Sequence, residues 1–174
     1  MLVALADTHA ETDLPLTDNL RETLGAADVV CHAGDFTTGA VLDAFEAATD
    51  RLVAVHGNSD GMAVRERLPA VATVEALGRK FLVVHGHEHD RTSLPLLARQ
   101  EGADVVVVGH THQPGVENIG ETVLVNPGSH ADPRGSQPAY ATFEGDRSDV
   151  RGRLRTPDGD PFSTFGVYTG RRKP

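Results

Sequence analysis

The chain has 174 residues, of which 39% are hydrophobic and 24% are charged, and these proportions are close to those of globular proteins. This length fits one domain, or one domain with a small extension, and the composition excludes a collagen, a disordered tail and a coiled coil. No apolar run approaches the roughly 20 residues that a membrane-spanning helix needs. The formal net charge of −9 argues against non-specific binding to nucleic acids or membranes, which depends on excess positive charge.

Short apolar runs alternate with helix-like segments through the first part of the chain. In chain order the predicted elements are a strand at 2–6, a helix at 14–24, a strand at 28–32, a helix at 40–48, a strand at 51–55, a hairpin of strands 71–77 and 81–84, a helix at 94–100 and a strand at 105–108. These strands are almost continuously apolar, as strands buried on both faces should be.

The later part of the chain is rich in predicted strands. They cover residues 116–119, 122–125 and 140–143, with an edge strand at 150–155. We therefore expect an α/β fold in which a two-sheet β-sandwich is flanked by helices, formed by a domain at residues 1–155. Residues 156–174 are expected to be a C-terminal tail that is partly ordered or is tied to the domain by Phe162, Phe165 and Tyr168.

The single cysteine, Cys31, lies inside a predicted strand, so we expect it to pack in the core. Cysteine poverty fits a reducing cytoplasm, and the apolar run 2–6 has no basic leader, so we expect a cytoplasmic protein without a signal peptide. The basic residues are two lysines and fourteen arginines. Together with the many acidic residues, this bias suggests a halophilic source, although GC-rich codon usage also replaces lysine by arginine.

Five of the predicted strands are followed by side chains that can bind a metal ion: Asp7 and His9, Asp35, Asn58, His85, and finally His110 and His112. Open α/β sheets place ligands outside the carboxyl ends of their strands, so these clusters are expected to converge. Glycines beside the clusters permit tight turns with positive φ. In Asp-x-His and His-x-His, alternate residues of an extended strand end point the same way, so both side chains are expected to reach one ion.

Carboxylate, amide and imidazole groups without a thiolate are typical of a nitrogen and oxygen metal site. Four imidazoles argue against a pure Mg²⁺ or Ca²⁺ site and leave Mn²⁺, Fe²⁺, Co²⁺, Ni²⁺ and Zn²⁺. Each motif alone more often serves packing or a turn. All five together, in order and at strand ends, predict a metal centre.

In order and spacing, the motifs Asp-x-His, Gly-Asp, Gly-Asn, His and Gly-His-x-His resemble the calcineurin-like metallophosphoesterases. The match is nearest to the small prokaryotic phosphodiesterase branch (YfcE-type), which is similar also in Asn126-Pro127-Gly128-Ser129 and Pro133-Arg134-Gly135. The resemblance covers residues 1 to about 145.

The resemblance implies two divalent metal ions, with manganese as the first expectation and nickel, iron, cobalt or zinc as alternatives. The first ion would be held by Asp7, His9, Asp35 and His112, and the second by Asp35, Asn58, His85 and His110, so that Asp35 bridges. A hydroxide bridging the ions would attack phosphorus in line and hydrolyse a phosphodiester of a small molecule or nucleotide. Asp35, Asn58 and His85 are then expected to be catalytic, while Asn58 and Arg134 would bind the substrate phosphate.

The sequence departs from the family pattern at Ser59, where many larger members have a histidine that contacts phosphate or protonates the leaving group. His87, His89 and His32 are the other candidate acids. Two alternative functions stay open: a non-enzymatic metal-binding scaffold resembling the retromer small subunit, and a phosphomonoesterase or nucleotide pyrophosphatase. The sequence also leaves the natural substrate open, and the oligomeric state, with a homo-oligomer as one option.

Overall fold

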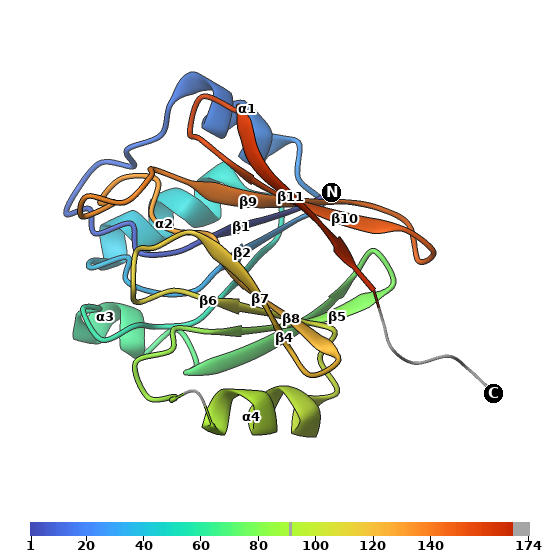
Figure 1. The fold of residues 1–174 in the computed structure, drawn as a ribbon. Helices are drawn as coiled ribbons and strands as arrows, with labels where there is room; N and C mark the ends of the chain where they lie inside the picture. The colour runs from blue at the N-terminus through green and yellow to red at the C-terminus, as the bar shows by residue number, and fades with distance from the viewer. Residues whose placement is uncertain (91, 169–174) are drawn as a thin grey trace.

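Two β-sheets pack face to face between layers of helix in the computed structural model, which describes residues 1–90 and 92–168 (Figure 1). Helices α1 and α2 (blue and cyan) cover the outer face of one sheet, and α4 (yellow-green) covers the outer face of the other. The structure confirms the two-sheet α/β sandwich that the sequence predicts.

The first sheet has six strands in the order β11-β10-β9-β1-β2-β3. Their bounds are β1 (Leu2–Leu5), β2 (Val29–His32), β3 (Leu52–Ala54), β9 (Tyr140–Gly145), β10 (Val150–Arg155) and β11 (Pro161–Val167). The strands β1, β2 and β3 are parallel, whereas β9 to β11 form an antiparallel meander that joins β1 through β9. The carboxyl ends of the three parallel strands therefore lie at the same edge.

The second sheet has five strands in the order β4-β5-β6-β8-β7. Their bounds are β4 (Val71–Ala76), β5 (Arg79–Val84), β6 (Val105–Val108), β7 (Gly115–Ile119) and β8 (Thr122–Asn126). The central strands β5, β6 and β8 are parallel, and an antiparallel hairpin closes each side.

Four helices connect these strands in the described part of the chain: α1 (Asp18–Gly25), α2 (Gly39–Ala48), α3 (Met62–Arg65) and α4 (Ser93–Glu101). The predicted helix 14–24 was wrong at its start, because the Thr17 hydroxyl caps α1 by accepting a hydrogen bond from the Leu20 amide at 3.2 Å. The four-residue α3 was not predicted. None of the helices in residues 1–90 and 92–168 is long and apolar enough to cross a membrane.

Alternating residues of the parallel strands fill two apolar layers, which explains their continuous hydrophobicity. Leu2 and Ala4 of β1 face the interior between the sheets and pack with Phe81 and Val105. Val3, between them in the sequence, faces α1 and α2. Cys31 lies in the inner layer, as predicted, and burial raises the pKa of its thiol to about 12.

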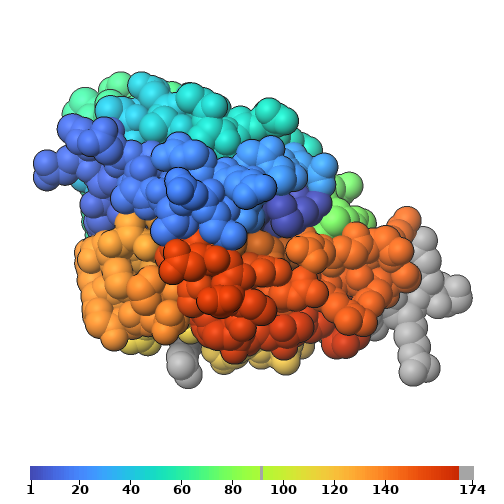
Figure 2. All heavy atoms as spheres, turned by 90° about the horizontal axis from the view of Figure 1, so that it is seen from above, coloured from blue at the N-terminus to red at the C-terminus, as the bar shows by residue number. Residues whose placement is uncertain are grey.

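The region 156–174 is described as far as residue 168, and residues 169–174 lie outside the described part. Strand β11 extends the first sheet at its edge, where Phe165 packs against the inner core while Tyr168 is 78% exposed. In Figure 2 the last strands (red and orange) lie beside the early chain (blue), and the Thr17 hydroxyl donates a hydrogen bond to the Pro157 carbonyl at 2.6 Å. These contacts tie the end of the described chain to its beginning.

Candidate metal centre

The loops after β1, β2, β3, β5 and β6 meet at one end of the sandwich, where both sheets contribute residues. The Asp7 amide donates to the Gly34 carbonyl at 3.0 Å, which joins the first two loops. His85 Nδ1 lies 2.7 Å from the Ala33 carbonyl oxygen and so joins the two sheets. The His110 amide donates to Asp7 Oδ1 at 3.0 Å, across 103 residues of sequence. The predicted ligands are therefore neighbours in space.

Two groups of three side chains offer ligand atoms that all lie within 4.8 Å of one another. One group is Asp7, His9 and His112, and the other is Asp7, Asp35 and His85. Asp35 Oδ2 lies 3.1 Å from His9 Nε2 and 3.4 Å from His85 Nε2. Both aspartates thus lie between the two groups, a suitable place for ligands shared by two cations.

The other two predicted ligands lie at the rim of these groups. Asn58 Oδ1 is 3.0 Å from His85 Nε2. The ring of His110 is 5.3 Å from the ring of His85, centroid to centroid, and the side chain is exposed. Asn58 therefore belongs to the same cluster, while His110 lies where the cluster opens to solvent.

Most of the predicted ligands have a left-handed backbone. Their φ angles are +54° at Asp7, +46° at His9, +61° at Asp35, +72° at His110 and +59° at His112. The expectation that alternate residues of an extended strand would aim these side chains was therefore wrong. Tight left-handed turns aim them instead, and each such residue costs on the order of 1–3 kcal/mol. Aspartate and histidine are among the side chains that tolerate this conformation best.

A glycine is required where the Asp35 loop approaches the loop after β3. A Cβ atom at Gly57 would lie 2.1 Å from Asp35 Oδ1 and 2.8 Å from the Asp35 amide nitrogen. Only glycine leaves room for the carboxylate of Asp35 at this position.

The buried carboxylate of Asp60 fixes these two loops, and the sequence analysis missed it. Its Oδ2 accepts hydrogen bonds from the amides of Asp35 (3.0 Å) and Gly57 (2.7 Å), and its Oδ1 accepts one from the Thr37 amide (2.7 Å). The Arg65 guanidinium, from α3, donates to the carbonyl oxygens of Asp60 and Gly57. The available signal was an aspartate close behind a Gly-Asn turn, since such carboxylates often accept backbone amides.

Two donor atoms of the cluster fit a bound cation. Asp7 Oδ2 and His112 Nε2 are buried, and neither has a hydrogen-bond partner among the described residues. His112 Nδ1 is bonded to the Asp132 carbonyl, and His85 Nδ1 to the Ala33 carbonyl, so Nε2 is the atom of each ring that could bind a metal. Buried polar atoms without partners are rare, and a cation would satisfy these two.

The pKa values of Asp7, Asp35 and His85 are set by burial and by the charges of neighbouring ligands. Burial alone would raise the pKa of Asp35, but hydrogen bonds from His85, His9 and the Ser59 amide hold it well below its usual range. Burial opposes a charge on His85, yet the Asp35 carboxylate outweighs it and raises the pKa of the imidazole. Burial raises the pKa of Asp7, against the opposing effect of His85. Because only a neutral imidazole binds a metal, a cation competes with a proton on His85.

His32, one of the candidate acids, lies in the core of the protein. It is fully buried, its Nε2 lies 2.8 Å from the Thr8 hydroxyl, and its Nδ1 accepts a hydrogen bond from the Gly34 amide. Burial holds the pKa of His32 well below its ordinary value. The ring of His87, another candidate acid, lies 5.2 Å from the ring of His85.

Arg134 lies at the rim, beside the first group of ligands. Its Nη2 is 3.4 Å from His9 Nε2, and its Nε donates to Asp132 Oδ2 at 3.1 Å. The side chain is 57% exposed. Arg134 thus forms an ion pair with Asp132 and remains exposed at the rim of the cluster.

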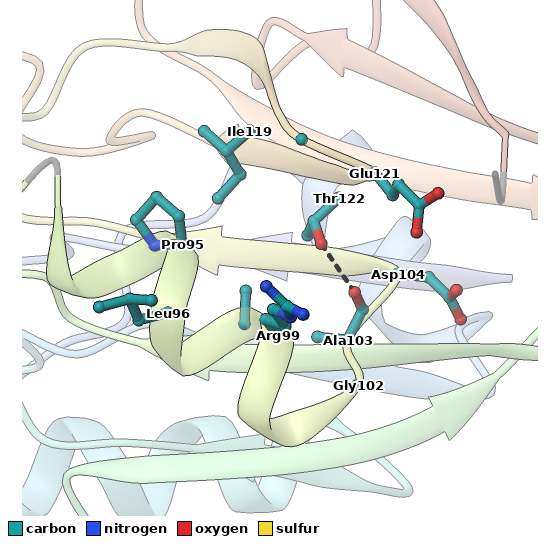
Figure 3. A pocket seen from close by; sticks show the side chains of 11 residues that line it. Pro95, Leu96, Arg99, Gly102, Ala103, Asp104, Ile119, Glu121 and Thr122 are labelled. Carbon is teal, nitrogen blue, oxygen red and sulfur yellow. Dashed lines mark hydrogen bonds between the residues drawn. The ribbon is translucent and has the colours of Figure 1, made fainter. Parts of the chain in front are cut away.

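Two cavities lie on the outer face of the five-stranded sheet. One, of about 580 Å³, lies between α4 and the β7–β8 hairpin and contains none of the predicted ligands (Figure 3). The other, of about 680 Å³, includes His110 in its lining. Pro95 and Ile119 line both, so the two cavities are neighbours.

A family model described as the calcineurin-like phosphoesterase superfamily domain matches residues 1–148. The "Probable metallophosphoesterase MJ0623" of Methanocaldococcus jannaschii is 32% identical over 139 residues, which are 77% of this chain and 70% of that protein. The "Phosphodiesterase YfcE" of Escherichia coli K12 is 31% identical over 166 residues, covering 83% of this chain and 88% of that protein.

The fold also matches solved structures. A single-mutant form of Vps29 from Entamoeba histolytica superposes with a TM-score of 0.79 at 20% identity, covering 96% of this chain and 99% of that one. At this identity the likeness shows the fold alone. The family model and the two relatives show more: the chain belongs to the calcineurin-like phosphoesterase superfamily.

Proposed function

We propose that this chain is a metal-dependent phosphodiesterase that hydrolyses a small-molecule or nucleotide diester. The observation that carries the proposal is the meeting of two groups of carboxylate and imidazole ligands at Asp7, whose Oδ2 is buried without a partner among the described residues. A superfamily of phosphoesterases and a relative named as a phosphodiesterase support this reaction class.

Two divalent cations fit the donor set. Asp7, His9, Asp35 and His112 would hold one, and Asp35, Asn58, His85 and His110 the other. Such cations supply Lewis acidity, which activates water and offsets the charge of the phosphoryl oxygens. The imidazole-rich set favours transition metals, with manganese proposed first and nickel, iron, cobalt and zinc as alternatives.

The residues of the chain have distinct tasks in this proposal. Asp35 stays ionised between both groups of ligands, held by the Ser59 amide at 2.8 Å. Asn58 contributes a neutral oxygen, which limits the negative charge of the centre, and its amide nitrogen can donate to a phosphoryl oxygen. The Ala33 carbonyl fixes the ring of His85. Arg134, exposed at the rim, can donate to the phosphate from the side of His9.

The test is the hydrolysis of bis(p-nitrophenyl) phosphate by the protein loaded with Mn²⁺, before and after a chelator. Asp35→Asn is expected to lower kcat/KM by about a thousandfold or more, since Asp35 would be a ligand of both cations in the proposed assignment. Asp43→Asn, a surface carboxylate paired with Arg67, is the control and should match the wild type. Chelator-resistant hydrolysis, or equal activity of the two variants, would contradict the proposal.

The alternative functions are separated in the same experiment. A non-enzymatic scaffold is the alternative that the shared fold with Vps29 accommodates. Two ions bound per chain with no turnover of any ester would favour it. Faster hydrolysis of p-nitrophenyl phosphate than of the diester would favour a phosphomonoesterase, and faster cleavage of a dinucleoside pyrophosphate would favour a pyrophosphatase.

A further inference from the structure

The 680 Å³ cavity beside His110 has the size of a small-molecule pocket. Its walls come from the loop after β5, the first turn of α4, and strands β6, β7 and β8. Helix α4 packs on the sheet through Leu94 and Ala98. Figure 3 shows the adjoining cavity, which is lined by Pro95 and Arg99 of α4 and by Ile119 and Glu121 of the β7–β8 hairpin.

The cavity begins where the candidate metal centre ends. Gly109 and His110 line it, and the amide of the same His110 donates to Asp7 Oδ1. His89, which was a candidate acid, also lines this cavity. A phosphodiester carries an organic group on each of two ester oxygens. When its phosphate lies at the metal centre, one of these groups can extend past His110 into the cavity.

The lining decides what kind of group fits. Aliphatic side chains form much of it, among them Leu94, Val108 and Leu124. The ionised side chains among the described lining residues are Asp90 and Glu117, and both are acidic. Apolar surface favours an organic ring or chain, whereas two carboxylates repel a further phosphate.

We propose that this cavity binds the uncharged, partly apolar alcohol group of the phosphodiester that is hydrolysed at the metal centre, and that it selects against groups carrying a second phosphate. The inference rests on the proposed phosphodiesterase function. It adds the substrate class: diesters with one neutral organic group of roughly nucleoside size, rather than polyphosphorylated nucleotides.

Three substrates with the same leaving group test the inference on the Mn²⁺-loaded enzyme: methyl p-nitrophenyl phosphate, thymidine 5′-(p-nitrophenyl phosphate), and the latter with an additional 3′-phosphate. The neutral nucleoside should have a kcat/KM about tenfold or more above the methyl ester, since it buries apolar surface in the cavity. The 3′-phosphate should cancel this advantage, chiefly by raising KM.

Two matched pairs of variants locate the effect. Glu117→Lys should raise kcat/KM for the 3′-phosphorylated substrate, relative to that for the unphosphorylated nucleoside, by about tenfold. Glu121 lies on the same hairpin but lines the other cavity, so Glu121→Lys should keep the wild-type ratio of these two values. Leu124→Trp, from the cavity side of β8, should reduce the preference for thymidine over methyl by filling the cavity. Leu96→Trp, on the exposed side of α4, should not.

The outcomes separate this inference from the function on which it rests. If no metal gives hydrolysis of any of the three diesters, the phosphodiesterase proposal fails and the cavity assignment fails with it. If all three diesters are hydrolysed with kcat/KM values within about threefold, or if Glu117→Lys and Glu121→Lys act alike, the phosphodiesterase stands and the cavity assignment is overturned.

Discussion

The carboxylate of Asp60 illustrates how a single buried residue stabilises the centre without belonging to it. It accepts three backbone amides, two of which belong to Asp35 and Gly57. Asp35 and the neighbouring Thr37 both have positive φ, a conformation that these residues adopt at a cost in energy. Asp60 is therefore a positioning residue that offsets this cost with three charge-assisted hydrogen bonds.

Asp60→Asn should lower the free energy of unfolding by about 2–3 kcal/mol, because an amide group turns an N–H donor toward backbone donors inside the protein. Asp146→Asn is the control, since Asp146 also accepts backbone amides, from Ser148 and Asp149, but in an exposed turn. The Asp146→Asn variant should lose less than about 1 kcal/mol of the free energy of unfolding, measured in urea. Equal losses in both variants would mean that Asp60 does not hold the loops.

His130 should make stability depend on pH. Its ring is 7% exposed, and burial lowers the pKa of His130 to about 4, from 6.5 in an unfolded chain. Above pH 6.5 the ring is neutral in both states and has no effect on stability. As the pH falls from 6.5 to 4, His130 is protonated in the unfolded chain but stays neutral in the folded chain. The free energy of unfolding therefore decreases, by roughly 3 kcal/mol once the pH is below 4.

The comparison is the free energy of unfolding between pH 7 and pH 4 for the wild type and His130→Phe, both without added metal. The variant should lose less stability over this range. The stability of the variant should still fall somewhat with decreasing pH, because burial also lowers the pKa of His32. Parallel curves for the two proteins would show that His130 takes up protons equally in the folded and unfolded states.

Among the elements, those with a strong apolar pattern were predictable and those without it were not. The run at 105–108 was predicted with the bounds that β6 has in the structure. Helix α3 buries only Val64 over four residues, too short a stretch for a helical period to appear. Strand β11 contains a proline and a glycine, and most of its side chains are exposed or half-buried, so its sequence carries little strand signal.

The meeting of the ligands could be predicted, but not the way in which they are held. Parallel strands bring their carboxyl ends to one edge, so motifs after five strands were expected to converge. His9 and His112 have positive φ, and each is bonded to a distant residue: the His9 amide to the Asp35 carbonyl, and the His112 ring to the Asp132 carbonyl. Local sequence does not encode such contacts. The same holds for Asp60, whose role appears only once Thr37 lies beside it.

Strand β11 has one aromatic ring that packs and one that does not, which makes a matched test. The Phe165 ring lies 5.8 Å from the Phe143 ring, at 83°, and covers Gly152, where a Cβ atom would meet it at 2.2 Å. Phe165→Ala should lower the free energy of unfolding by about 2–3 kcal/mol, below the cost at a fully buried site. Phe162→Ala, 45% exposed, should change it by less than about 0.5 kcal/mol. Similar losses for the two variants in urea unfolding would mean that the packing of β11 contributes little to stability.

At the scale of the whole molecule, the dominant property is the excess of acidic charge. The formal net charge is −9, and the ion pairs Arg67–Asp43 and Arg151–Asp149 lie at the surface, where such pairs stabilise little. Mutual repulsion among the remaining carboxylates is therefore a cost to the folded state at low salt.

If the composition reflects adaptation to high salt, the midpoint of thermal unfolding should rise steadily with KCl up to molar concentrations, beyond the range in which screening of surface charge is complete. Simple screening saturates earlier, because the Debye length is already about 3 Å at 1 M salt. Tetramethylammonium chloride at equal ionic strength is a suitable control for screening alone. A protein that is equally stable with and without KCl would leave codon usage as the origin of the arginine bias.

The left-handed ligand residues have a consequence for protein engineering. Glycine adopts their backbone geometry without strain, so at Asp7, His9, Asp35, His110 and His112 it is the replacement that relaxes the main chain while removing the donor atom. Selection for heat resistance alone would favour this exchange at exposed His110, whereas at Asp7 and Asp35 it would also remove carboxylates that accept the His110 and Ser59 amides. A directed-evolution campaign therefore needs a second selection, for ion binding, to retain the imidazole at position 110.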